Sequence, residues 1–231
     1  MKNIKKAFTL AEVLLVVAII GVVAAMAIPN LNKSIGEDKK VMLYRSTTEQ
    51  LNAALGKVIS EYGSYNNASK DGCPDSKNGH YCATLKMTSY LDVGYNCGDT
   101  NKDKCFSSQK ITMYTGSDVD SDLTTGNGTC DYTFLLTNGV GVCNRGSVFE
   151  LDLDGPNNGP NSRGIDLFRL DMVNDVLAPL PSYDTRGTRE SDTFVDFVNY
   201  DRYNQWLFEI GNMDYLKCAN SLNWINKHTC D

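Results

Sequence analysis

The residues from Leu10 to Ile28 form an apolar run of 19 residues whose only charge is Glu12. An α-helix of this length can cross the hydrocarbon core of a bilayer. Three lysines precede the run, and this bias predicts a cytoplasmic N-terminus and an exported remainder. A carboxylate near the middle of a membrane helix costs about 2.5–3.5 kcal/mol, so Glu12 needs a compensating role.

Two simple interpretations of this run leave Glu12 without such a role. The first is a secretory signal peptide that is cleaved after Ala27, since Ala25-Met26-Ala27 fits an A-x-A site, which would release a binding domain. The second is a plain membrane anchor. It could also carry a periplasmic enzyme, for which His80 or His228 would be the residues to examine.

The stretch "KKAFTLAE", residues 5–12, resembles the processing site of type IV pilins and type II secretion pseudopilins. The resemblance implies that a prepilin peptidase cuts between Ala7 and Phe8, after which the new amine is methylated. Glu12 would then be the fifth residue of the mature chain. The family usually has Gly before the cut, where this chain has Ala7. Pro29 stands where the family commonly places a helix-bending proline.

This resemblance also gives Glu12 its role. In a filament the apolar helices pack together, and the amine of Phe8 on one subunit would need a negative partner from a neighbour. Removing one member of a buried ion pair typically costs about 3–5 kcal/mol, so Glu12 is expected to set the register between subunits. The partners implied are other pilin-like subunits, the prepilin peptidase, and an inner-membrane assembly platform with its ATPase. The expected location is the inner membrane, with the filament in the periplasm or at the cell surface.

The expected organisation has three parts: a leader over 1–7, a long helix over 8–63 with its membrane half at 8–28, and a globular domain over 64–231. Beyond Pro29, apolar residues recur at intervals of three and four, which is typical of an amphipathic helix, and Gly63 is a plausible stop. Alternating strand segments follow, with Asn138-Gly139 as the strongest hairpin signal. We therefore expect an α+β, pilin-like fold in which the helix packs on an antiparallel sheet.

Eight cysteines follow the apolar run, and none lies within it. The even number and the absence of any C-x-x-C pair favour disulfides in an oxidising compartment over a zinc site. Eight cysteines allow 105 pairings, of which the simplest joins neighbours along the chain. That pairing is Cys73 with Cys82, Cys97 with Cys105, Cys130 with Cys143, and Cys218 with Cys230.

The segment "ELDLDGPNNGPNSRGIDLF" is the best candidate for a metal site. Oxygen ligands in a Gly/Pro-rich loop suit Ca²⁺ better than zinc or copper, and some pseudopilins hold calcium near the sheet. The alternative is a tight connection in which Asn and Asp side chains bond to their own backbone. No cofactor is required, and the candidate ligands for Ca²⁺ are Asp152, Asp154, Asn157, Asn161 and Asp166, with Asn158 beside them.

Composition and motifs argue against two other classes of protein. A net charge of -6 and a pI near 5.0 leave no basic stripe for phosphates, which argues against nucleic-acid binding. There is no G-x-S-x-G, no P-loop pattern and no H-E-x-x-H. We therefore expect a structural protein and no enzymatic activity.

Overall fold

The computed structural model describes residues 10–117, 129–179 and 202–230. The chain consists of two compact units, Met1–Lys39 and Lys40–Asp231, and one long helix, α1 (Leu10–Tyr62), contributes to both. The helix continues through Pro29 and ends where Gly63 adopts φ 82°, a left-handed conformation that glycine reaches without a steric penalty. The Gly63 N–H donates to the carbonyl oxygen of Ile59 at 2.7 Å and closes the last turn.

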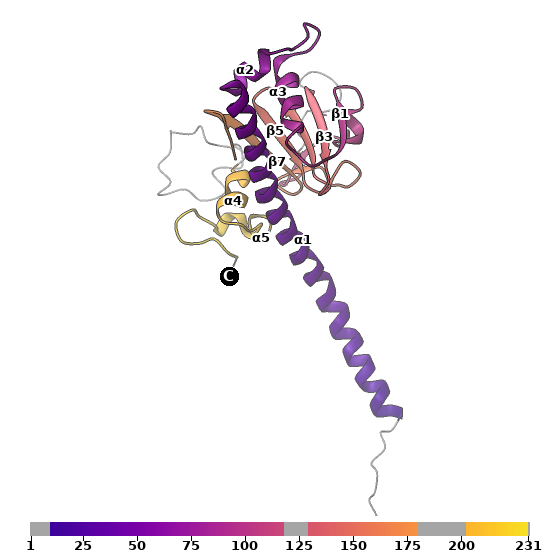
Figure 1. Cartoon of the computed structure of the whole chain (residues 1–231). Helices are drawn as coiled ribbons and strands as arrows, with labels where there is room; N and C mark the ends of the chain where they lie inside the picture. Colours follow the sequence, from indigo (N-terminus) through magenta and orange to yellow (C-terminus); the bar gives the residue numbers. More distant parts are fainter. Residues whose placement is uncertain (1–9, 118–128, 180–201, 231) are drawn as a thin grey trace, which may run out of the picture. The chain divides into compact units, whose positions relative to one another are not determined.

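In the second unit, α1 buries one side against the core. The side chains of Tyr44, Leu51, Leu55 and Val58 are at most 1 % exposed, and they recur every three to seven residues along the helix. Complete burial of such a side chain contributes about 1.5–3 kcal/mol. The Tyr44 ring lies 5.1 Å from the ring of Phe168, so this part of α1 packs directly on the sheet (Figure 1).

Within the described residues the sheet has eight strands, in the order β1-β3-β4-β5-β7-β6-β2, and β8 pairs with β7. The antiparallel pairs β3–β4, β4–β5, β5–β7 and β7–β8 form its centre. Its strands are β1 (Val93–Gly98), β2 (Thr112–Met113), β3 (Tyr132–Leu136), β4 (Gly141–Arg145), β5 (Val148–Asp152), β6 (Ser162–Arg163), β7 (Leu167–Val173) and β8 (Val176–Pro179).

The predicted α+β class is confirmed, and the central strand pairs are antiparallel as predicted, but the sheet as a whole is mixed. The short strand β6 pairs in parallel with β2 and with the first residue of β7. Thr112 and Ser162, the partners at the β2–β6 pair, are fifty residues apart in the sequence. Strands of two residues are too short to show a periodic pattern of apolar residues. Hydrophobic alternation in the sequence therefore could not predict these pairings.

Two of the hairpin turns, between β3 and β4 and between β7 and β8, follow from local sequence. Gly139 has φ 90°, and the N–H of Val140 donates to Asn138 Oδ1 at 3.1 Å. Asn174 and Asp175 have φ 51° and 62°, the left-handed pair that a two-residue turn between β7 and β8 requires. The turn predicted at Asn138-Gly139 is present.

Short helices and four disulfides complete the second unit. The bridges join Cys73 to Cys82, Cys97 to Cys105, Cys130 to Cys143, and Cys218 to Cys230, which is the pairing of neighbours along the chain. The other elements in the described residues are α2 (Tyr65–Lys70), α3 (Gly79–Thr88), η1 (Lys102–Lys104), α4 (Tyr203–Glu209), α5 (Tyr215–Cys218) and η3 (Ala219–Ser221).

Candidate functional site

The N-terminal motif leads directly into α1. Glu12 lies in the first turn of the helix and is exposed. A carboxylate in the first turn interacts favourably with the partial positive charge of a helix N-terminus. Pro29 lies within the helix. Ala7 and Phe8, the predicted cleavage residues, lie outside the described residues.

Large apolar side chains of α1 are exposed just after Glu12. Leu14, Val16, Val17, Ile19 and Ile20 are 53–62 % exposed. Five such side chains within seven residues form a surface whose burial would be favourable by about 25 cal/mol per Å². This half of α1 is therefore suited to contact lipid or other apolar helices.

No helix in the described part of the chain combines the length and the hydropathy that a membrane crossing requires.

The predicted metal loop begins at the end of β5 with two facing carboxyl groups. Asp152 is fully buried, and its Oδ1 accepts a hydrogen bond from the N–H of Gly155 at 3.0 Å. Asp152 Oδ2 and Asp154 Oδ1 are buried without a hydrogen-bond donor among the described residues. Lys40 of α1 pairs with Asp154, with its Nζ 3.6 Å from Asp154 Oδ2.

Ionisation of Asp152 beside two other carboxyl groups is unfavourable. Burial, together with the negative charges of Asp154 and Asp166, raises the pKa of Asp152 to about 8. Burial also raises the pKa of Asp166. A proton or a bound cation would relieve the repulsion between Asp152 and Asp154, so this pair can take up either one.

The other predicted ligands have different partners. Asp166 accepts from the N–H of Ser162 at 2.5 Å and from that of Asn161 at 2.8 Å. The Asn161 amide donates to Gln109 Oε1 at 3.1 Å. The carboxylate of Asp166 therefore bonds to the main chain of its own loop, which is the alternative to a metal ligand.

The two remaining asparagines lie at the surface. Asn157 is exposed, and the exposed Asn158 donates to the carbonyl oxygen of Asp154 at 2.5 Å. Across residues 10–117, 129–179 and 202–230, no group of three or more His, Cys, Asp or Glu side chains is placed to hold a metal ion. Calcium binding by this loop stays a prediction.

One buried ion cluster in the middle of the sheet was not expected from the sequence. Glu150 of β5 is 1 % exposed, and its Oε1 accepts from Arg163 Nη2 at 2.7 Å. Arg145 Nη2 lies 3.7 Å from the same oxygen. The only signal in the sequence was an acid inside the apolar strand "VFEL". Since paired charges are the form in which ions are tolerated inside proteins, this cluster has a structural role.

The two histidines lie in separate places. His228 contacts Trp206, with 5.8 Å between the ring centroids. His80 stacks on Tyr65 at 5.9 Å and lines an open polar pocket of about 500 Å³. Lys70, Cys73 and Lys77 also line this pocket, which lies between α2 and the start of α3.

Residues 2–28 match the prokaryotic N-terminal methylation motif. This motif is the hallmark of type IV pilins and pseudopilins, and it covers the basic leader, Ala7, Phe8 and Glu12. The chain therefore carries the N-terminal signature of a prepilin-peptidase substrate, the class of protein indicated by the resemblance. No curated protein and no solved structure matches the chain.

Proposed function

We propose that this chain is a structural subunit of a type II secretion pseudopilus or a type IV pilus. Its leader would be removed between Ala7 and Phe8, and the new amine would be methylated. The observation that carries the proposal is the methylation motif over 2–28, with Glu12 in the first turn of a helix whose apolar side chains are exposed.

The proposed location follows from charge and from the disulfides. The lysines before the apolar run favour a cytoplasmic N-terminus, with 8–28 crossing the inner membrane once. Four disulfides in the second unit suit the periplasm, because that compartment is oxidising. The domain over 64–231 would be a pilin-like fold, and its bulk favours a minor subunit over a major one.

The proposed mechanism of assembly is mechanical and needs no catalysis by this chain. Association of the apolar helices supplies the free energy, and the charge pair between Glu12 and the amine of Phe8 on a neighbour sets their register. Cleavage also removes Lys2, Lys5 and Lys6, which changes the formal charge from -6 to -6 - 3 = -9, leaving the new amine aside. An assembly platform and its ATPase would extract the subunit from the membrane.

The first test is the mass of the mature chain. Co-expression with a prepilin peptidase should yield a chain that begins with N-methylated Phe8. A mature chain that begins at Ile28 would instead support a signal peptide and a released binding domain.

The second test is assembly of Glu12 variants. Glu12→Gln and Glu12→Ala should be processed and inserted normally, but should fail to enter filaments. Asp38→Asn is the matched control, since Asp38 is an exposed acid further along the same helix. Filaments built from Glu12→Ala, or from a chain that retains its leader, would contradict the mechanism.

We also propose a calcium-binding function for the loop after β5. It rests on the buried oxygens of Asp152 and Asp154 that face no donor among the described residues. Calcium should raise the melting temperature of the full chain relative to EDTA, while magnesium at the same concentration should not, because Mg²⁺ demands a tighter octahedral set of ligands. Identical melting curves in calcium and EDTA would contradict calcium binding by this loop.

A further inference from the structure

The four disulfides differ in their access to solvent. Two of them are buried, since Cys97, Cys105, Cys130 and Cys143 are at most 5 % exposed. In the other two, at least one cysteine is half-exposed: Cys73 in the first, and both Cys218 and Cys230 in the second. Thiol–disulfide exchange requires a thiolate to reach a sulfur atom, so only these two bridges are open to it in the folded protein.

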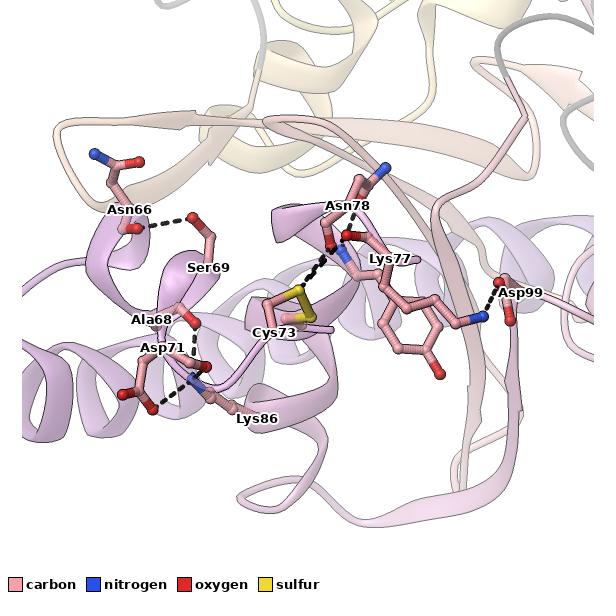
Figure 2. Close-up of a disulfide and its surroundings, with 11 residues drawn as sticks. Asn66, Ala68, Ser69, Asp71, Cys73, Lys77, Asn78, Lys86 and Asp99 are labelled. Carbon is pink, nitrogen blue, oxygen red and sulfur yellow. Dashed lines mark hydrogen bonds and ion pairs between the residues drawn. A yellow bond between two sulfur atoms is a disulfide. The ribbon is translucent and has the colours of Figure 1, made fainter. Parts of the chain in front are cut away.

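The pocket beside Cys73 contains cations that an incoming thiolate can approach. Cys73 lines the open pocket of about 500 Å³ together with Lys70, Lys77 and the acid Asp75. Figure 2 shows Cys73 between α2 and the segment that carries Lys77 and Asn78. Lys77 forms an ion pair with Asp99, whereas Lys70 is exposed at the end of α2. A thiolate that enters this pocket therefore meets a nearby cation.

The other half-exposed bridge lies beside a carboxylate. The N–H of Cys230 donates to Asp214 Oδ2 at 3.2 Å, and Cys230 Sγ lies 3.3 Å from the carbonyl oxygen of Asp214. Lys217 pairs with the other carboxylate oxygen of Asp214 at 3.1 Å and offsets part of its charge. Cys73 Sγ also lies near a main-chain oxygen, 3.5 Å from the carbonyl oxygen of Asn78. The difference at Cys230 is therefore the carboxylate of Asp214, whose negative charge disfavours the approach of a thiolate there relative to Cys73.

The position of Cys82 makes it a suitable leaving group. Cys82 is 5 % exposed and lies in the first turn of the ten-residue helix α3, which starts at Gly79. The partial positive charge at the N-terminal end of a helix stabilises a thiolate there. A better stabilised thiolate leaves faster in disulfide exchange.

We propose that the Cys73–Cys82 bridge is the thiol-exchange site of this protein and that its partner is a dithiol oxidoreductase. A thiolate of the partner attacks Cys73 Sγ, the S–S bond breaks, and its electron pair leaves on Cys82 Sγ. The partner's second cysteine thiolate then attacks the sulfur of the partner's first cysteine in the mixed disulfide. This step releases Cys73 as a thiolate. The chain gains two electrons and two protons as a dithiol, and the partner is oxidised to its disulfide. The same steps in reverse form the bridge.

Opening this bridge would change the structure only locally. Lys86 of α3 donates to the carbonyl oxygens of Ala68 at 2.8 Å and Asp71 at 2.6 Å, so it joins α3 to the end of α2 without the bridge (Figure 2). Ala68 and Ala83, one from each helix, are fully buried in the core. The segment between the helices, which carries Lys77 and its contact to Asp99, would gain freedom while α2 and α3 stay docked.

The first experiment measures the order in which the bridges open in the folded, full-length protein. The chain is treated with dithiothreitol without denaturant, free thiols are alkylated at intervals, and labelled cysteines are mapped by mass spectrometry. Cys73 and Cys82 should be labelled at least about tenfold faster than the other six. Earlier labelling of Cys218 and Cys230, or simultaneous labelling of all eight, would overturn the proposal.

The second experiment tests the role of the pocket charge. Lys70→Gln should slow opening by glutathione about threefold and should slow opening by 2-mercaptoethanol less, because the glutathione thiolate carries more negative charge. Lys57→Gln is the matched control, since Lys57 is exposed on α1 and is not among the residues that line the pocket. Equal effects of the two variants would contradict the electrostatic argument.

The third experiment tests the class of partner. A thioredoxin-type oxidoreductase whose resolving cysteine is replaced by serine cannot complete the second step, so it should remain attached to the full chain. The mixed disulfide should map to Cys73. Attachment at Cys218 or Cys230, or no attachment at all, would reject the proposal.

Discussion

The side-chain amide of Asn52 pairs with the main chain of Leu177 through two hydrogen bonds. Asn52 Oδ1 accepts from the N–H of Leu177 at 2.8 Å, and Asn52 Nδ2 donates to the carbonyl oxygen of Leu177 at 2.8 Å. Leu177 belongs to β8, which pairs on its other side with β7. A helix side chain thus takes the place of a neighbouring strand and satisfies backbone groups that an edge strand would leave open.

Replacing Asn52 should therefore destabilise the second unit. Asn52→Ala leaves two backbone groups of β8 without their partner, and we expect a loss of about 1–3 kcal/mol in the free energy of unfolding. Urea denaturation measures this loss. Lys57→Ala on the same helix should change stability by less than about 0.5 kcal/mol, and an equal loss in both variants would show that the pairing contributes nothing specific.

Lys86 should contribute more than an ordinary surface lysine. Its ammonium group donates to two carbonyl oxygens, pairs with Asp71 at 3.1 Å, and lies 4.1 Å from the centre of the Tyr62 ring. Lys86→Met keeps the stem but removes the charge, so we expect it to lower the melting temperature in calorimetry. Lys57→Met serves as the control. A melting temperature equal to that of the unchanged protein would show that water replaces these contacts at no cost.

The buried Asp152 should make stability depend on pH. Its pKa is about 8 in the folded protein against 3.8 as the ordinary value, so between these limits the native state binds a proton that the unfolded state has lost. The free energy of unfolding should therefore fall as pH rises from about 4 to about 8, by at most about 1.4 kcal/mol per pH unit. Urea denaturation at several pH values in EDTA measures this slope. Asp152→Asn should flatten the slope, and an unchanged slope in that variant would assign it to another group.

The residue before the predicted cleavage site should control the rate of processing. The resemblance places Gly where this chain has Ala7, so Ala7→Gly should be cleaved faster by prepilin peptidase than the natural sequence. A bulky residue, as in Ala7→Phe, should block cleavage. Immunoblots of precursor and mature chain over time measure both rates. Normal processing of Ala7→Phe would place the cut elsewhere.

Much of the candidate site could be predicted from local sequence because its signals are local. The basic residues, Ala7, Phe8 and Glu12 lie within one short segment, and the methylation motif found over residues 2–28 supports that prediction. The helix stripe through Tyr44 and Val58 and the turn at Asn138-Gly139 follow from periodicity and from glycine's freedom at positive φ. The neighbour pairing of the cysteines is present in the structure, although the sequence had left many alternatives open.

The structure differs from the prediction where contacts join distant segments. Three features depend on which residues the fold brings together. They are the parallel pairing of β2 with β6, the ion pair of Glu150 with Arg163, and the hydrogen bonds of Asn52 to the edge of β8. The contact of Asn161 with Gln109 has the same origin, whereas Asp166 bonds within its own loop.

The sequence by itself determined the processing motif, the α+β class and the elements whose patterns repeat within one helix or one hairpin. Only the tertiary structure decided the mixed sheet, the facing of Asp152 and Asp154, and the exposure of Cys73 beside Lys70. The reason is physical: local patterns record the backbone conformation of neighbouring residues, whereas burial, charge pairing and solvent access arise only when segments far apart in the chain pack together.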